Sequence, residues 1–93
     1  MKLPRVSVIV PSWNVRAELA ECLSAVAAAR EEVDGLELVV VDDASGDGSA
    51  ELVARDFPWA RLFAHAKNEG FTAAVNRGLL AARGEHVLLL NAD

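Results

Sequence analysis

Disulfide-forming cysteines, basic residues and long apolar runs are all scarce in this 93-residue sequence. The single cysteine, Cys22, cannot form an internal disulfide, and we expect it to be a buried thiol on the apolar side of a helix. No apolar run approaches the roughly 20 residues that span a bilayer, and residues 2–10 lack a signal-peptide cleavage pattern. We therefore expect no transmembrane segment and a cytoplasmic location.

Basic side chains are outnumbered, with nine Lys and Arg against fourteen Asp and Glu and a net charge of -5. No Lys/Arg cluster stands out, so we expect no binding to a nucleic-acid backbone. This composition is still compatible with a bound nucleotide, because a metal ion or backbone amides can hold its phosphates.

The residues that are abundant predict one small folded domain over residues 1–93. The apolar content is 53% and the mean hydropathy is +0.23, which excludes a disordered chain, while 25% charged residues exclude a membrane protein. A chain this short buries only about 60 to 65% of its unfolded surface, so the core is modest and there is no room for a second domain.

The stretch from residue 36 to residue 49 organises the chain. Residues 38–41 form an unbroken apolar run, typical of a strand buried on both faces. Asp42 and Asp43 follow at once, at the end of the strand where parallel sheets bind ligands. The Gly-Asp-Gly-Ser sequence after them predicts a tight turn into a helix.

Strands and helices are expected to alternate along the chain. Strands are predicted over residues 6–10, 36–41, 61–64 and 86–90, the last one buried, and helices over 15–30, 50–57 and 72–83. Pro11 is expected to end the first strand, Asn14 to cap the first helix, and Gly84 to end the last helix in the left-handed conformation.

This alternation predicts a three-layer, mostly parallel, Rossmann-like α/β sheet with strand order 3-2-1-4. Polar residues collect at the carboxyl ends of three strands, in residues 11–14, at Asp42 and Asp43, and in residues 91–93. With this order the chain reverses between strands one and four. The predicted crevice lies beside Trp13 and Asp93, and it is suited to a nucleotide.

Four motifs carry a resemblance to a known family. They are Val-Ser-Val-Ile-Val-Pro-Ser-Trp-Asn (6–14), Val-Val-Val-Asp-Asp-Ala-Ser-Gly-Asp-Gly-Ser (39–49), Asn-Glu-Gly-Phe-Thr-Ala-Ala-Val-Asn-Arg-Gly (68–78) and Leu-Leu-Leu-Asn-Ala-Asp (88–93). In this order they resemble the motifs of family-2 inverting glycosyltransferases, with most similarity to a branch that includes rhamnosyltransferase-like enzymes. The resemblance implies a GT-A fold, a nucleotide-diphosphate sugar as donor, and a role in polysaccharide, cell-envelope or lipid-linked glycan assembly.

For the base of the donor, the chemistry and the resemblance agree. A uracil or thymine ring needs a flat partner and an acceptor for its imide N–H, which an aromatic ring and a carboxylate supply. The resemblance assigns these roles to Trp13, in a turn with Pro11 and Asn14, and to Asp43, with Asp42 as its neighbour. It implies a UDP- or TDP-sugar. The alternatives are that Trp13 is a core or rim aromatic and that the acids only shape the turn and cap the next helix.

For the diphosphate, an acidic protein needs a divalent cation, and oxygen ligands suit Mg²⁺ or Mn²⁺. Asp93 resembles the final acid of the family's DxD-type motif, whereas Asn91 stands where that motif has an acid. The alternative is that Asp93 is only a polar strand end.

Three residues resemble the nucleotide-side loop and helix of the family, namely Asn68, Gly70 and Asn76. Gly70 permits close backbone approach, and amides at the following helix start can receive phosphate or ribose oxygens. The alternative is an ordinary turn and helix. His65 and His86 show no metal or catalytic spacing, so we expect them to be structural.

No residue resembles the general base that deprotonates the acceptor hydroxyl in this family. We therefore expect a truncated, donor-binding half without turnover of its own, and the alternative is a non-catalytic fragment or assembly module. An oxidoreductase would need a Gly-x-Gly-x-x-Gly turn after the first strand, and a phosphoacceptor receiver domain carries its acid pair after the first strand, not the second. We also expect self-association through the exposed edge of the strand over residues 86–90.

Overall fold

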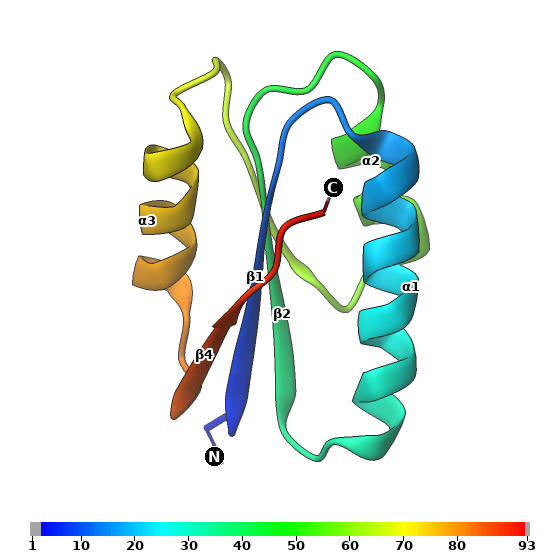
Figure 1. Ribbon diagram of the computed structural model, residues 1–93, viewed down its shortest axis with the longest axis vertical. Helices are drawn as coiled ribbons and strands as arrows, with labels where there is room; N and C mark the ends of the chain where they lie inside the picture. Colours follow the sequence, from blue (N-terminus) through cyan, green and yellow to red (C-terminus); the bar gives the residue numbers. More distant parts are fainter. Residues whose placement is uncertain (1–2, 93) are drawn as a thin grey trace.

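The computed structural model describes residues 3–92 and shows a four-stranded parallel sheet between two helical layers (Figure 1). Helix α3 covers one face, and helices α1 and α2 cover the other. The sheet order is β3-β2-β1-β4, as predicted. The elements in chain order are β1 (Val6–Ser12), α1 (Arg16–Glu32), β2 (Leu36–Asp42), α2 (Ser49–Asp56), β3 (Arg61–Ala64), α3 (Phe71–Ala81) and β4 (His86–Leu89).

Two apolar cores form because successive side chains of β1 and β2 point to opposite faces of the sheet. Val8, Val10 and Val40 pack under α1 and α2, while Ile9 and Val39 pack under α3. The prediction that the second strand is buried on both faces is therefore confirmed. Within residues 3–92, no helix is long and apolar enough to cross a membrane.

Cys22 lies on the sheet side of α1, as its spacing indicated, but it is only partly buried at the margin of the core. Burial raises the pKa of its thiol. The expectation of a buried thiol was therefore wrong in degree, because Leu19, Leu23 and Val26 occupy the centre of that face.

Pro11 does not end the first strand, because β1 continues to Ser12. The carbonyl of Ile9 accepts a hydrogen bond from the amide of Leu90, on the β4 side of β1. Two residues further on, Pro11 faces the same side, where β4 has already ended. The N–H that proline lacks therefore has no partner strand to lose, and the prediction was wrong for this reason.

The N-terminus of α1 is capped from another part of the chain. Asn14 was predicted as its cap, but Asn14 adopts a positive φ of 52°, and the cap position falls on Val15, whose side chain makes no capping bond. The Asp47 side chain caps the helix instead. Its Oδ2 accepts a hydrogen bond from the amide of Arg16 at 3.1 Å, and its Oδ1 accepts one from the amide of Ser49 at 3.1 Å, in the first turn of α2.

Gly84 does not end α3 in the left-handed conformation. The helix ends at Ala81, and Gly84 is not among the described glycines with a positive φ. Its amide donates to Ser7 Oγ at 2.8 Å, and a Cβ on Gly84 would lie 2.7 Å from the Ser7 amide nitrogen. The glycine is needed for this close approach to β1 rather than for a turn.

The fourth strand, β4, is shorter and more exposed than predicted. It spans four residues rather than five, and Val87, Leu88 and Leu89 are 45 to 49% exposed. The prediction of a buried strand was wrong because, among the described residues 3–92, β4 pairs with β1 alone and lies at the edge of the sheet.

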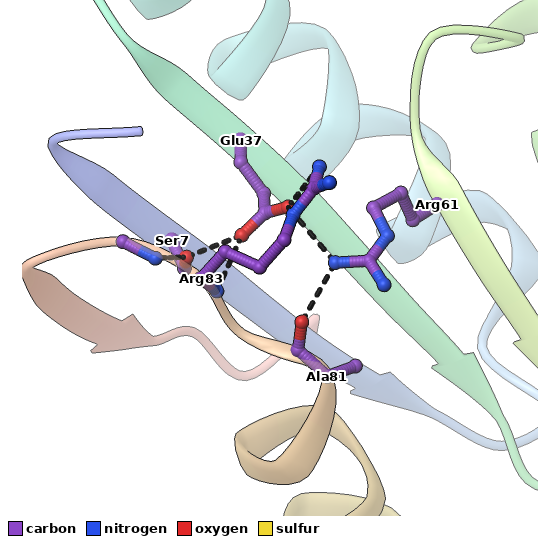
Figure 2. Close-up of polar contacts among 6 residues, drawn as sticks. Ser7, Glu37, Arg61, Ala81 and Arg83 are labelled. Carbon is purple, nitrogen blue, oxygen red and sulfur yellow. Dashed lines mark hydrogen bonds and ion pairs between the residues drawn. The ribbon is translucent and has the colours of Figure 1, made fainter. Parts of the chain in front are cut away.

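A charged cluster stabilises the end of the sheet where strands β1, β2 and β3 begin. It is centred on Glu37 of β2 (Figure 2). The Glu37 carboxylate accepts hydrogen bonds from the Ser7 hydroxyl at 2.5 Å, from Arg61 Nη1 at 2.9 Å, and from the amide and Nε of Arg83. Arg61 Nη1 also donates to the carbonyl oxygen of Ala81 at 2.7 Å. Burial alone would raise the pKa of Glu37, but these hydrogen bonds outweigh it and lower the pKa to about 2. One ionised side chain thus connects three strands and the end of α3.

Candidate functional site

A cavity of about 400 Å³ opens at the carboxyl ends of β1 and β2, beside the N-terminus of α3. It lies at the edge of the sheet where ligands bind in open α/β folds, at the reversal of strand order between β1 and β4. Of the residues predicted from the sequence, six line it, namely Pro11, Trp13, Asp43, Asn68, Gly70 and Asn91.

Two aromatic rings line this cavity. Trp13 follows β1 directly and is 54% exposed, so it is not a core residue. Phe71, the first residue of α3, is 58% exposed and lines the same cavity. An exposed ring beside a cavity offers a flat surface for a planar ligand.

Asp43 is the buried anion of the cavity. Its Oδ1 accepts hydrogen bonds from His65 Nδ1 at 2.9 Å and from the amide of Glu69 at 2.8 Å, and its Oδ2 accepts one from the amide of Gly70 at 2.9 Å. Burial raises the pKa of Asp43, but the three hydrogen bonds outweigh burial and hold that pKa below its ordinary value. Asp43 therefore stays ionised and fixed in orientation at neutral pH.

Asp42 and Asn14 lie next to the cavity but are not among the residues that line it. Asp42 accepts hydrogen bonds from the Ser45 amide at 3.0 Å and from the Ser45 hydroxyl at 2.6 Å. The Asn14 side-chain oxygen Oδ1 accepts a hydrogen bond from the Gly46 amide at 2.8 Å, and the Asn14 backbone N–H donates to the Ser45 hydroxyl oxygen at 2.9 Å. The Asn14 bonds join the turn that carries Trp13 to the loop after β2. The Asp42 bonds shape that loop, and this is the turn-forming role that the sequence left open for Asp42.

The structure brings Gly70 and Asn68 together with Asp43, but not Asn76. Gly70 has a φ of 98°, which favours glycine, and its amide contacts both Asp43 Oδ2 and, at 3.1 Å, Asn68 Oδ1. Asn76 lies on the exposed surface of α3 and does not line the cavity.

Comparison with known proteins decides the family. Residues 7–93 match the family described as glycosyl transferase family 2. The chain belongs to this family. The α/β fold and the strand order β3-β2-β1-β4 also agree with the GT-A fold that the four motifs implied.

Among family-2 relatives, the putative glycosyltransferase EpsH of Bacillus subtilis is 30% identical over 95 residues, which cover 100% of this chain and 27% of that protein. A mannosyltransferase from Pyrobaculum calidifontis, solved with GDP-Man and Mn²⁺, has a TM-score of 0.84 and 37% identity, covering 100% of this chain and 28% of that one. S. aureus TarS 1-349, solved with UDP-GlcNAc, has a TM-score of 0.78 and 31% identity, covering 96% and 26%. The chain thus spans about a quarter of the length of these relatives. They leave the rhamnosyltransferase-like branch a prediction.

Few side chains within residues 3–92 of this family-2 chain are placed to bind a metal ion. Within residues 3–92, no three His, Cys, Asp or Glu side chains gather where they could hold a metal. Asn91 lines the cavity with an amide oxygen, which is a suitable donor for Mg²⁺ or Mn²⁺. Asp93, the predicted acidic ligand, lies outside the described residues.

Phe71 and Ser12 line the cavity, and His65 bonds to its residue Asp43, but none of these three was predicted from the sequence as a site residue. His65 was expected to be structural, yet it bonds to Asp43, 22 residues away in the chain. Phe71 stood inside the Asn-Glu-Gly-Phe motif, which was the available signal. Ser12 lines the cavity with a buried hydroxyl that finds no hydrogen-bond partner within the described part of the chain.

Proposed function

We propose that this chain is the donor-binding part of a family-2 glycosyltransferase and that it binds a nucleotide-diphosphate sugar, with UDP or TDP as the nucleotide. The observation that carries the proposal is the placing of an exposed Trp13 and an ionised, oriented Asp43 on one cavity of about 400 Å³. Solved family-2 structures that contain UDP-GlcNAc and GDP-Man support the class of ligand.

In this proposal each residue has one chemical task. Trp13 stacks on the base, and Asp43 accepts the imide N–H of a uracil or thymine ring. The free amides in the first turn of α3, which begins at Phe71, donate hydrogen bonds to ribose or phosphate oxygens. Asn14 and Asp42 support these groups from behind by holding the turn of Trp13 and the loop after β2.

The diphosphate needs positive charge, because the chain has a net charge of -5 and no described basic residue lines the cavity. We assign this role to Mg²⁺ or Mn²⁺, with the amide oxygen of Asn91 and the carboxylate of Asp93 as protein ligands. When bound, such an ion neutralises the charge that develops on the leaving diphosphate.

Transfer of the sugar to an acceptor hydroxyl requires a general base, but Asp43 in the cavity and Asp42 beside it are already engaged in hydrogen bonds. Asp43 accepts three hydrogen bonds and Asp42 accepts two. The proposal therefore assigns donor binding to these residues and the deprotonation step to a part of the enzyme other than residues 3–92. It keeps the predicted cytoplasmic location, which cell fractionation tests.

Calorimetric titration with UDP and TDP, each with and without Mn²⁺, tests this function. We expect Mn²⁺-dependent binding that is weakened at least about tenfold by Asp43→Ala and by Trp13→Ala, since each removes a direct contact. Asp93→Ala should reduce the affinity measured with Mn²⁺ to the affinity measured without it, and should leave the latter unchanged. Asp56→Ala is the matched control, because Asp56 is exposed on α2, outside the set of residues that line the cavity, and forms an ion pair with its neighbour Arg55.

An absence of heat with every nucleotide, from a chain shown by circular dichroism to be folded, would refute donor binding by this chain. That result would favour the second candidate, a non-catalytic assembly module. The observation in favour of that candidate is the exposed apolar strand β4 at the sheet edge.

A further inference from the structure

The number of acceptor positions left on Asp43 limits what the cavity can recognise. An ionised carboxylate offers about four acceptor positions, two on each oxygen. His65 and the Glu69 amide occupy both positions of Oδ1, and the Gly70 amide occupies one position of Oδ2. One position therefore remains, and since Asp43 lines the cavity, it is the one that a ligand can use.

The bond from His65 is the only side-chain contribution to this set, since the other two donors are backbone amides. The ionised carboxylate can only accept, so the hydrogen of this bond belongs to Nδ1 of the imidazole. The His65 side chain is 12% exposed, and the carboxylate of Glu69 lies 3.8 Å from its Nδ1, which also favours a hydrogen on that nitrogen. His65 thus fixes the rotation of the Asp43 carboxylate and fills the second position of Oδ1.

The nucleobases differ in what they present to such an acceptor. Uracil and thymine offer a single imide N–H between two carbonyls. Guanine offers two parallel N–H donors, from N1 and the exocyclic amine, which pair best with both oxygens of a free carboxylate. Cytosine has a bare acceptor nitrogen at the same place, which an ionised carboxylate repels.

We propose that His65 is a positioning residue that restricts Asp43 to one free acceptor, so that the cavity selects a uracil or thymine diphosphate over a guanine diphosphate. The inference rests on the proposed function and deepens it, because relatives of this fold are solved with both kinds of base. It assigns the choice to residues of this chain, namely His65 and the loop at Glu69 and Gly70.

Titration of the full chain with UDP, TDP, GDP and CDP in the presence of Mn²⁺ tests the selection. Wild type should bind UDP and TDP at least about tenfold more tightly than GDP or CDP, the effect of one hydrogen bond to a charged group. UDP methylated at N3 of the ring, which lacks the imide N–H, should lose a similar factor. This second measurement needs no variant and therefore cannot fail through misfolding.

Substitutions at His65 test the positioning. His65→Phe empties one position on Oδ1 and releases the carboxylate, so the preference for UDP over GDP should fall to less than about threefold. His65→Asn keeps an N–H donor near the place of Nδ1 and should keep most of the preference. His86→Phe is the matched control, because His86 is exposed on β4 and should leave the preference unchanged.

The two failures are distinguishable. If none of the four diphosphates binds, the proposed function is wrong, and this inference falls with it. If UDP binds but GDP or N3-methyl UDP binds as tightly, or if folded His65→Phe keeps the full preference, only the inference is overturned.

Discussion

Removing the charge of Glu37 should destabilise the fold, and by an amount that depends on pH. The pKa of Glu37 is lowered from 4.5 to about 2 in the folded protein, because its hydrogen bonds to Ser7, Arg61 and Arg83 outweigh its burial. The Glu37 side chain is only 6% exposed. The shift corresponds to about 3 kcal/mol of folding free energy at neutral pH. Both arginines are partly exposed, and solvent screening of their charges widens the expected contribution to about 2 to 3 kcal/mol.

The sign of the pH dependence follows from the direction of this shift. A carboxyl with a lowered folded pKa contributes its full stability above its unfolded value of 4.5, and loses it as the pH falls toward about 2. Glu37→Gln should therefore be less stable than wild type by about 2 to 3 kcal/mol at pH 7, and the difference should shrink between pH 5 and pH 2. Urea unfolding at pH 7, 5 and 3, followed by circular dichroism, measures this.

Glu31→Gln is the matched control, because Glu31 is an exposed residue of α1 and its change should alter stability by no more than about 0.5 kcal/mol. The reasoning fails if Glu37→Gln costs as much at pH 3 as at pH 7. Such a result would mean that packing and shape around Glu37, rather than its ionised form, stabilise the cluster.

Two further predictions concern the sheet. Gly84→Ala should lower the unfolding free energy by about 2 kcal/mol, because its Cβ would lie 2.7 Å from the backbone nitrogen of Ser7; Gly46→Ala, where nothing lies within 4 Å, should change it little, and thermal melting compares the two. The 93-residue chain should self-associate through the β4 edge, and Leu88→Lys should reduce this, because a lysine on an edge strand opposes pairing; a wild type that stays monomeric at high concentration in sedimentation velocity contradicts the prediction.

The fold could be predicted because its main determinants are local in the sequence. The apolar run in β2 shows by itself that both faces of the strand are covered, and the alternation with helical segments then implies a parallel sheet. The errors came from residues whose role depends on a distant partner. Gly84 reads as a helix exit until Ser7, 77 residues earlier, is placed beside it. Pro11 reads as a strand end until the shorter β4 is seen.

Part of the cavity could also be predicted from the sequence, because several of its residues stand in local motifs. Trp13, Asp43 and Gly70 stand in motifs at strand ends and in a turn, so their convergence follows from the topology. His65 has no sequence signal, because a lone histidine after β3 becomes informative only when the carboxylate it contacts is known. Asp93, the expected metal ligand, stays a prediction.

The double contact of Asp47 has a consequence for the order of folding. The amide of Arg16, at the start of α1, meets its acceptor only when a loop 31 residues later has docked. Before β2 and its loop are in place, the first turn of α1 lacks this partner, and it should fray and exchange its amide hydrogens with solvent. The turn that carries Trp13 immediately precedes that helical turn, so the edge of the sheet that bears the cavity should become ordered late, after the centre of the sheet has formed.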